Sequence, residues 1–270
     1  MIAGKHPVEE AFAARRPAVR LLVVPERRVA LDNLVIHATT LRIPVVEVEG
    51  GTLTSLAGFD GHQGVALVAQ RRVQASIDDI LARARERGEP PFVLVLDSLE
   101  DPQNLGTLLR SAEACGVHGV FYPERHAAPL TPAAIKTAAG ATEHLLLAAV
   151  SDLAATLADL RVRGMRAIGA DQSAALGYAQ ADLRGPLALV VGSEGFGLSG
   201  QLRRRLDQTV RIPMRGKVSS LNAAVAGSVL LFAAAEQRAG PEQPALNAPP
   251  LETAPGEADA PLTEPSAADE

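Results

Sequence analysis

The stretch DSLEDPQNLGTLLRSAEACG, residues 97–116, places polar side chains at the start of a predicted helix. Asn104 follows a proline and opens this helix, where it could cap the backbone or contact a ligand. Four apolar residues at helical spacing predict the buried stripe: Leu105, Leu108, Leu109 and Ala112. Gly106, Arg110 and Glu113 fall on another face. Arg110 beside a glycine could hold an anionic substrate group, and a solvated Arg–Glu helix pair is the alternative.

A second polar stretch, LALVVGSEGFGLS at residues 187–199, breaks a predicted buried strand with Gly192, Gly195 and Gly197. Glycine lets the backbone approach a ligand closely and offer it N–H and C=O groups. The spacing differs from the G-x-G-x-x-G order of dinucleotide-binding folds, which argues against a nicotinamide cofactor. Glu194 inside the loop could cap a helix N-terminus or hold a neighbouring loop in place.

A third stretch, IPMRGKVSSLNAAVAGSVLLFAAAEQR at residues 212–238, runs from a turn into a long apolar helix. Ser219, Ser220 and Asn222 lie where the helix N-terminus would point at a ligand. One of the two serines is expected to be a plain N-cap of this helix. Four residues at helical spacing predict its core-facing side: Leu221, Val225, Val229 and Phe232.

Strands and helices alternate from residue 91 to about residue 238, which predicts a mostly parallel sheet covered by helices. In such open sheets, ligands bind beyond the carboxyl ends of the strands, where loops turn into helices. We therefore expect the three polar stretches to lie at this edge of the sheet and to form the functional site.

The remaining chain divides into a small unit, a connection and a tail. Residues 1–72 predict a small α/β domain with three strands, and the charged residues 73–90, with one possible helix, predict a linker. Residues 91–239 form the predicted larger α/β domain. Residues 240–270, rich in Pro, Ala and Glu, predict a disordered acidic tail.

The composition indicates a globular protein, because 47% of the residues are hydrophobic. The longest apolar runs are far shorter than the roughly 20 residues that cross a bilayer, and the N-terminus has no apolar signal core. We therefore expect a cytoplasmic protein without a membrane partner. Six scattered histidines and the single Cys115 offer no metal-ligand spacing, so no metal is expected, and Cys115 is expected to be a small buried residue.

The formal net charge of −5 depends on the tail, which holds seven acids and no Lys or Arg. Residues 1–240 carry 26 basic against 24 acidic side chains, so bulk charge does not decide whether the partner is a nucleic acid. Local arginine clusters could form a phosphate track, although a solvated charged surface is the alternative. With only 3% aromatic residues, base stacking should contribute little to any nucleic-acid binding, which would favour recognition of shape and backbone.

The three stretches, in this order and spacing, resemble the motifs of the SpoU/TrmH family of S-adenosylmethionine-dependent RNA 2′-O-ribose methyltransferases. DPQNLGTLLRSAEACGV is similar to its first motif, LVVGSEGFGLS to its second and IPMRGKVSSLNAAVA to its third. GKHPVEEAF and GHQGVALVA near the N-terminus resemble the family's small substrate-binding domain. Domain order and the SLN sequence look most like the branch that methylates a guanosine in large-subunit rRNA.

The resemblance implies a SPOUT-type α/β domain with a deep C-terminal trefoil knot, a rare exception to the rule against knots. It implies S-adenosylmethionine as the cofactor, RNA as the substrate and a homodimer. Small residues on the last helix, among them Ala223, Ala226, Gly227 and Ala234, fit close packing in a dimer or, equally, inside one chain.

Carried over position by position, the resemblance implies these catalytic-site residues: Asn104, Arg110, Glu194, Ser220 and Asn222. It implies these cofactor-binding residues: Gly192, Gly195, Gly197, Ile212, Met214 and Leu221. For RNA, the predicted contacts are Arg15, Arg16, Arg71, Arg72, Arg203, Arg204, Arg215 and Lys217.

The reaction implied by the resemblance needs help with one proton, because a ribose 2′-hydroxyl is a poor nucleophile until it is deprotonated or polarised. The family's usual proposal makes the motif-one arginine, here Arg110, the base. A guanidinium stays protonated in proteins, so we hypothesise that Arg110 clamps the target phosphate and orients the hydroxyl, while the phosphate or a water accepts the proton. Glu194 and Asn222 would organise the loops, and Ser220 would hydrogen-bond near the hydroxyl.

Three alternatives remain at this stage. The same chemistry could act on tRNA, or the chain could be a non-catalytic knotted RNA-binding protein. A nicotinamide-dependent oxidoreductase is the third alternative, against which the glycine order and its late position in the sheet argue.

Overall fold

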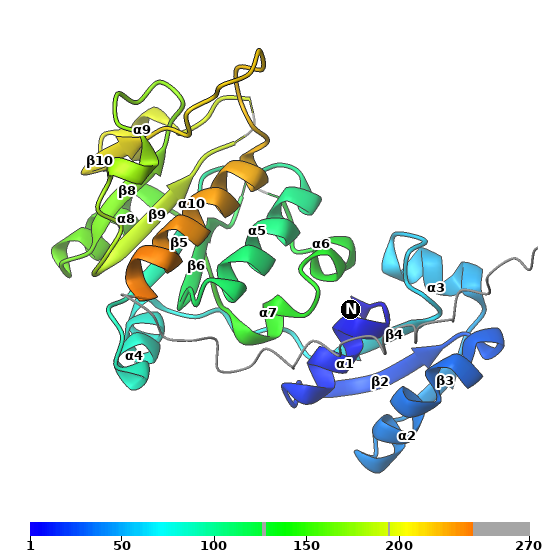
Figure 1. Cartoon of the computed structure of the whole chain (residues 1–270). Helices are drawn as coiled ribbons and strands as arrows, with labels where there is room; N and C mark the ends of the chain where they lie inside the picture. Colours follow the sequence, from blue (N-terminus) through cyan, green and yellow to red (C-terminus); the bar gives the residue numbers. More distant parts are fainter. Residues whose placement is uncertain (126–127, 194, 240–270) are drawn as a thin grey trace, which may run out of the picture. The chain divides into compact units, whose positions relative to one another are not determined.

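The computed structural model describes residues 1–125, 128–193 and 195–239, and these residues form two separate β-sheets. Figure 1 shows the smaller sheet in blue and the larger one behind the orange helix α10. The predicted tail, residues 240–270, and Glu194 lie outside the described residues. The domain boundaries expected at residues 72, 90 and 239 stay predictions.

The small sheet has the strand order β1-β4-β2-β3, built from β1 (Ile2–Ala3), β4 (Val65–Ala69), β2 (Ala18–Val23) and β3 (Val45–Glu47). Only β2 and β3 pair in parallel; the other pairs are antiparallel. Successive residues of β2 point to opposite faces, so Leu21 packs with α1 (Lys5–Ala13) and α2 (Asp32–Thr40), and Leu22 packs with α3 (Gly50–Ala57).

The large sheet has the order β10-β8-β9-β5-β6-β7, and all its pairs are parallel. The strands are β5 (Phe92–Leu96), β6 (Gly119–Pro123), β7 (Leu146–Val150), β8 (Arg166–Ala170), β9 (Leu187–Val191) and β10 (Gln208–Val210). Every residue of β5 and β9 is buried, because helices cover both faces. The prediction of a mostly parallel α/β sheet is confirmed.

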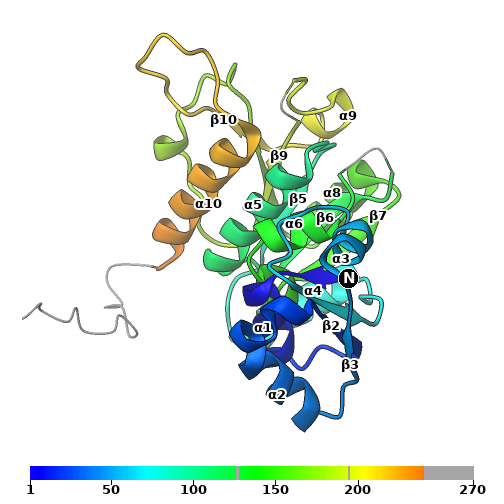
Figure 2. The same ribbon diagram turned by 90° about the vertical axis from the view of Figure 1, so that its right-hand side faces the viewer.

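Two groups of helices cover the large sheet. One face packs against α5 (Pro102–Ala114), α7 (Ala141–His144) and α10 (Ala223–Ala239). The other packs against α4 (Ile77–Arg87), α8 (Leu153–Val162) and α9 (Gly200–Arg203). α6 (Pro132–Thr137) lies against α5 and β1. Figure 2, turned by a right angle, shows α5 and α10 side by side, as Figure 1 does.

Some elements differ from their predicted positions. The apolar run VRIP, residues 210–213, predicts a strand, but the strand lies at Gln208–Val210, because residues 208–210 pair with Ile168–Ala170 of β8. The short elements β1, α3 and α7 were not predicted from the sequence. The trefoil knot that the resemblance implies stays a prediction.

Cys115 follows α5 as its C-cap residue and is buried, as expected for a small apolar side chain. Burial raises the pKa of its thiol to about 11, so the unreactive thiol form dominates at neutral pH. Within the described part of the chain, no helix has the length and apolar character needed to cross a bilayer, and no three His, Cys, Asp or Glu side chains gather as metal ligands.

Candidate active site

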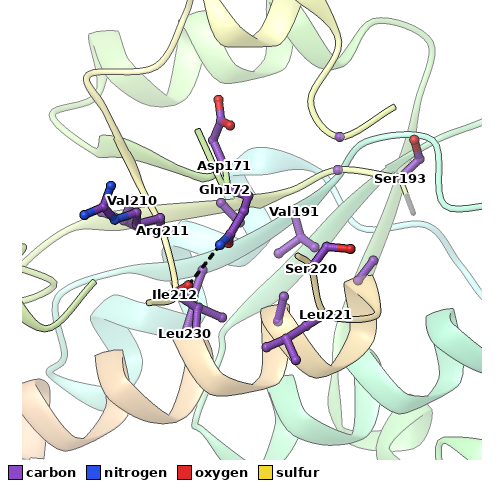
Figure 3. A pocket seen from close by; sticks show the side chains of 15 residues that line it. Asp171, Gln172, Val191, Ser193, Val210, Arg211, Ile212, Ser220, Leu221 and Leu230 are labelled. Atoms are coloured by element: carbon purple, nitrogen blue, oxygen red, sulfur yellow. Dashed lines mark hydrogen bonds between the residues drawn. The ribbon is translucent and has the colours of Figure 1, made fainter. Parts of the chain in front are cut away.

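A pocket opens at the carboxyl ends of β8, β9 and β10, next to the start of α10. β8 contributes Ala170 and the following Asp171 and Gln172, and β9 contributes Val191 and the loop behind it. Figure 3 shows side chains from these separate loops around one hollow, with the Gln172 amide directed at the Ile212 carbonyl oxygen, 3.3 Å away. Ligands of open parallel sheets bind at this edge, as predicted from the sequence.

The loop after β9 folds back on itself at Gly192. A Cβ atom on Gly192 would lie 2.2 Å from the carbonyl carbon and oxygen of Gly197 and 2.6 Å from the amide nitrogen of Leu198. Ser193 and Gly197 exchange two backbone hydrogen bonds of 3.1 Å. Gly192 therefore permits a tight backbone turn whose two sides both line the pocket.

Asp97, the first residue after β5, hydrogen-bonds to Ser199 at the C-terminal end of the glycine-rich loop. Its carboxylate is 4% exposed and accepts a 2.6 Å hydrogen bond from the backbone nitrogen of Ser199. Ser199 in turn caps α9. Leu198, between the loop and this cap, is buried in the core. The glycine-rich loop is thus anchored at both ends to the sheet.

Asn222 caps the helix that borders the pocket. Its side-chain oxygen accepts from the backbone nitrogens of Ala224 at 2.9 Å and Val225 at 3.2 Å. The expectation that Ser219 or Ser220 is the cap is wrong, because α10 begins at Ala223, one residue after Asn222. Ser220 is exposed and lines the pocket instead.

The amide nitrogen of Asn222 donates to the side-chain oxygen of Asn104 at 3.0 Å. Asn104 does not cap α5; Asp101 does, by accepting from the backbone nitrogen of Gln103 at 2.8 Å. The hydrogen bond between Asn222 and Asn104 thus joins the third predicted motif to the first.

Close packing brings α5 and α10 together behind this pair. Gly227 lies against Leu108, where a Cβ atom would come within 2.5 Å of Leu108 Cδ2. Ser111 and Ser228 share a 2.8 Å hydrogen bond. The buried side of α10 consists of these residues: Ala223, Ala224, Gly227, Leu230, Leu231 and Ala234.

Two predictions about helix faces are corrected here. Leu221, Val225 and Phe232 are 38%, 48% and 54% exposed, so the predicted core face of the last helix is wrong; small residues turn inward because α5 lies so close. Gly106 does not accompany Arg110 on a polar face. It is buried against α6, where a Cβ atom would lie 2.5 Å from the Ala134 carbonyl oxygen.

The other predicted site residues differ in whether they line the pocket. Gly192, Gly197, Ile212, Ser220 and Leu221 line one pocket, whereas Gly195 and Met214 are not among its described lining residues. Arg110 is exposed on α5, outside the described lining. Glu194 is outside the described residues, so its predicted role stays a prediction.

The predicted RNA contacts divide by their present partners. Arg72 donates to Glu143 at 2.6 Å, and Arg16 lies 3.9 Å from the same carboxylate, which is 1% exposed. Arg203 pairs with Asp171 at 2.6 Å. The remaining predicted contacts are exposed: Arg15, Arg71, Arg204, Arg215 and Lys217.

Sequence reasoning missed several polar residues of this site, among them Asp97, Asp171 and Gln172. Asp171 accepts hydrogen bonds from both the backbone nitrogen and the hydroxyl of Ser173 and also holds Arg203. Asp97 and Asp171 each come directly after a buried strand, which is a signal that the sequence carries.

The lining suits a nucleoside with charged substituents. Val191, Val210, Ile212 and Leu230 supply apolar walls for a flat base, and Gly192 and Gly197, which have no side chains, offer backbone groups to the pocket. A Gly192 side chain would collide with the opposite side of the loop, so this surface depends on bare backbone. The residues present therefore fit an adenosine-containing cofactor.

Comparisons with known proteins agree with this geometry. Residues 91–232 match the SpoU rRNA Methylase family, and residues 1–75 match the RNA 2′-O ribose methyltransferase substrate binding family. An uncharacterized tRNA/rRNA methyltransferase of Mycobacterium avium is 40% identical over 88% of this chain and 78% of its own length. An uncharacterized tRNA/rRNA methyltransferase of Mycobacterium tuberculosis, Rv3579c, is 39% identical over 90% of this chain and 76% of its own length.

A solved structure has a similar fold and contains a cofactor. The SpoU methyltransferase AviRb of Streptomyces viridochromogenes, in complex with AdoMet, superimposes with a TM-score of 0.75. It is 26% identical, and the match covers 89% of this chain and 91% of AviRb.

The fold and pocket define an α/β methyltransferase with a small substrate-binding domain. The chain belongs to the SpoU/TrmH family of RNA methyltransferases, and its cofactor is S-adenosylmethionine. The resemblance seen in the sequence is confirmed, and the nicotinamide-dependent alternative is set aside.

Proposed function

We propose that this enzyme methylates a ribose 2′-hydroxyl of a guanosine in large-subunit rRNA. The observation that carries the proposal is the bonded pair of Asn104 and Asn222, in which Asn222 stands between the pocket-lining residues Leu221 and Ala223. The match of residues 1–75 to a 2′-O ribose methyltransferase substrate-binding family supports the ribose as the acceptor. An activity on ribosomal RNA also implies a cytoplasmic location.

The residues that would hold S-adenosylmethionine surround the pocket at Gly192, Gly197, Ile212 and Leu221. The bound cofactor supplies an electrophilic methyl group on a sulfonium, which needs no acid to leave. The protein must therefore fix the acceptor oxygen in line and assist the loss of one proton. Ser220, exposed at the pocket, is placed to hydrogen-bond the incoming hydroxyl.

Arg110 is proposed to position the acceptor as a cation. It is exposed on α5, one residue before Ser111, which holds α5 to α10 through Ser228. A guanidinium keeps its proton in essentially all protein settings, and its fork can bind a phosphate through two hydrogen bonds. Arg110 would therefore hold the target phosphate, and that phosphate or a water would accept the hydroxyl proton.

RNA is proposed to approach over exposed basic residues near the pocket. Arg204 and Arg205 directly follow α9, and Arg215 and Lys217 lie between β10 and α10. Each exposed cation that meets a phosphate adds affinity that falls with salt. Arg16 and Arg72 are placed differently, because their partner Glu143 is buried, so we propose a mainly structural role for these two.

The enzyme is proposed to act as a homodimer through the exposed side of α10. Val225 and Phe232, 48% and 54% exposed, leave apolar surface uncovered beside the pocket. Burying such side chains is favourable, so a second copy would gain stability there. Sedimentation of Phe232→Glu should give monomers where the natural chain gives dimers; an unchanged dimer would contradict this interface.

The choice between rRNA and tRNA needs a direct comparison. Tritiated methyl transfer from S-adenosylmethionine should be measured on separate unmodified transcripts of large-subunit rRNA, small-subunit rRNA and a tRNA mixture. We expect transfer to the large-subunit transcript. Transfer to tRNA alone would replace the proposed substrate, and cofactor binding without transfer to any RNA would favour a non-catalytic RNA-binding protein.

A further inference from the structure

Phe196 is an aromatic side chain left in solvent beside the cofactor pocket. It is 94% exposed and lies between Gly195 and Gly197 in the loop after β9. Its neighbour Gly197 and the preceding Ser193 both line the pocket. A ring exposed to this extent gains nothing from folding, and its place in a loop that lines the pocket leaves its face open to a ligand there.

The rest of the chain makes this exposure unusual. The chain has six phenylalanines, two tyrosines and no tryptophan, and all eight aromatic residues lie in the described part. Only Phe196 and Phe232 among them are exposed, and Phe232 lies on α10 in the proposed dimer surface. Phe196 is therefore the aromatic side chain available to a ligand at the mouth of the pocket.

The loop that carries Phe196 is held in place by backbone and side-chain contacts. Ser193 and Gly197 pair through two 3.1 Å hydrogen bonds, and Asp97 holds Ser199 at 2.6 Å. Leu198 is buried between these two anchors. A ring on a braced turn can act as a platform with little loss of conformational entropy when a ligand binds.

The surroundings indicate which ligand the ring would meet. Arg204 and Arg205, both exposed, follow Phe196 on the same segment of the chain and line a hollow beside the start of α8, so this segment presents positive charge to a polyanion. The ribose that receives the methyl group also carries a base. When this nucleotide enters the pocket, its base must unstack from the neighbouring bases of the RNA. An aromatic face can replace that lost stacking for any base.

We propose that Phe196 is a positioning residue that stacks on a nucleobase at, or next to, the methylated ribose. This inference rests on the proposed function, since it requires an RNA acceptor at this pocket. It refines the sequence-based expectation that aromatic stacking contributes little, because one ring at the reacting nucleotide affects positioning more than overall affinity.

The first test uses the absence of tryptophan in the natural chain. Phe196→Trp places a single indole at this position, and its fluorescence is measured during titration with the unmodified large-subunit rRNA transcript and with S-adenosylmethionine alone. RNA should quench the indole by stacking, with or without the cofactor. Quenching by S-adenosylmethionine alone would show that the ring covers the cofactor. An indole fluorescence that does not respond to RNA would show that the ring does not stack on a base. Either result overturns the proposal.

The second test separates stacking from simple apolar contact. Phe196→Ala and Phe196→Leu should raise the RNA concentration for half-maximal methylation by about tenfold, while Phe196→Trp restores it. Cofactor affinity should stay unchanged in all three variants. Val162→Ala, at an 87% exposed position on α8, is the matched control for loss of an exposed apolar side chain.

The wild-type rate in the same assay tests the proposed function separately. If the natural chain methylates RNA and Phe196→Leu does so with the same RNA dependence, the stacking role is wrong and the proposed function stands. If Phe196→Ala changes sedimentation of the dimer instead, the ring belongs to a subunit contact and the proposal is overturned.

Discussion

The amide nitrogen of Asn222 lies 3.0 Å from the side-chain oxygen of Asn104, across 118 residues of sequence. The same Asn222 side chain accepts from two backbone nitrogens of α10 through its oxygen. The side-chain oxygen of Asn222 faces the backbone of α10, and the nitrogen of the same amide group faces Asn104. One side chain thus sets where the last helix begins and ties it to α5.

Replacing Asn222 should separate these two tasks. Asn222→Ser keeps an oxygen able to cap α10 but is too short to donate to Asn104, so stability should change little while methyl transfer falls about tenfold. Asn222→Ala should lose both, with a cost of about 1 kcal/mol in unfolding free energy. Denaturant unfolding and single-turnover rates provide the two readouts. Full activity in Asn222→Ser would show that the asparagine pair has no functional role.

Gly192 should be intolerant of any side chain. The added methyl group of Gly192→Ala would lie 2.2 Å from backbone atoms of Gly197, so the loop must shift. We expect cofactor affinity, measured by calorimetry, to fall by more than about tenfold, because fixed backbone groups line that surface. Gly51→Ala is the control: nothing lies within 4 Å of its Cβ position, and alanine favours helix α3. Undiminished cofactor binding in Gly192→Ala would argue against this loop as part of the site.

Arg110 should be needed for its shape as well as its charge. Arg110→Lys keeps the cation but loses the planar fork, so single-turnover methylation should fall while cofactor binding stays constant. Arg110→Ala should fall further. Rates measured at saturating RNA distinguish alignment of the hydroxyl from RNA affinity. A lysine variant with nearly full rate and unchanged RNA affinity would contradict the phosphate clamp.

His118 should make the fold sensitive to acid. It is fully buried, with Nδ1 accepting from the Phe92 backbone nitrogen at 3.0 Å and Nε2 lying 3.1 Å from Glu89. Burial lowers the pKa of His118 below its ordinary value of about 6.5, and Arg87 and Arg238 act in the same direction.

The sign of the pH effect follows from this shift. Above about pH 6.5 both folded and unfolded chains hold a neutral His118, so its stabilising contribution is complete there. As the pH falls, the unfolded chain takes up a proton first, and stability drops by up to about 1.4 kcal/mol per pH unit. Urea unfolding between neutral pH and pH 5 should show this slope, and His118→Asn should reduce it, whereas the exposed His6→Asn should not. Equal slopes in all three proteins would assign the acid sensitivity to other groups.

The sequence predicted the large sheet well, because its central strands consist of uninterrupted apolar residues. FVLVL and LALVV are buried on both faces, so composition and length alone indicated parallel strands under helices. Because the strands are parallel, the loops that follow them lie at the same edge of the sheet, at the carboxyl ends of the strands. Gly192 was predicted from the second polar stretch and Ile212, Ser220 and Leu221 from the third, and all four line one pocket.

The last helix could not be predicted correctly from apolar periodicity. Phe232 and Val225 are larger and more apolar than Gly227 or Ala234, and spacing alone placed them inward. The close approach of α5 to α10 instead turns small residues inward, because Leu108 fills the space that a side chain at Gly227 would need. Three polar residues near the helix start also competed for the cap, and contact with Asn104 favours Asn222 over the serines.

The central claim is that the pocket at the carboxyl ends of β8, β9 and β10 serves methyl transfer to an RNA ribose. The most direct measurement is nuclease digestion and nucleoside analysis of large-subunit rRNA that has received tritiated methyl groups from S-adenosylmethionine. We expect label in 2′-O-methylguanosine, at a level strongly reduced in Arg110→Ala. Label on a base, or transfer that Arg110→Ala leaves intact, would contradict it.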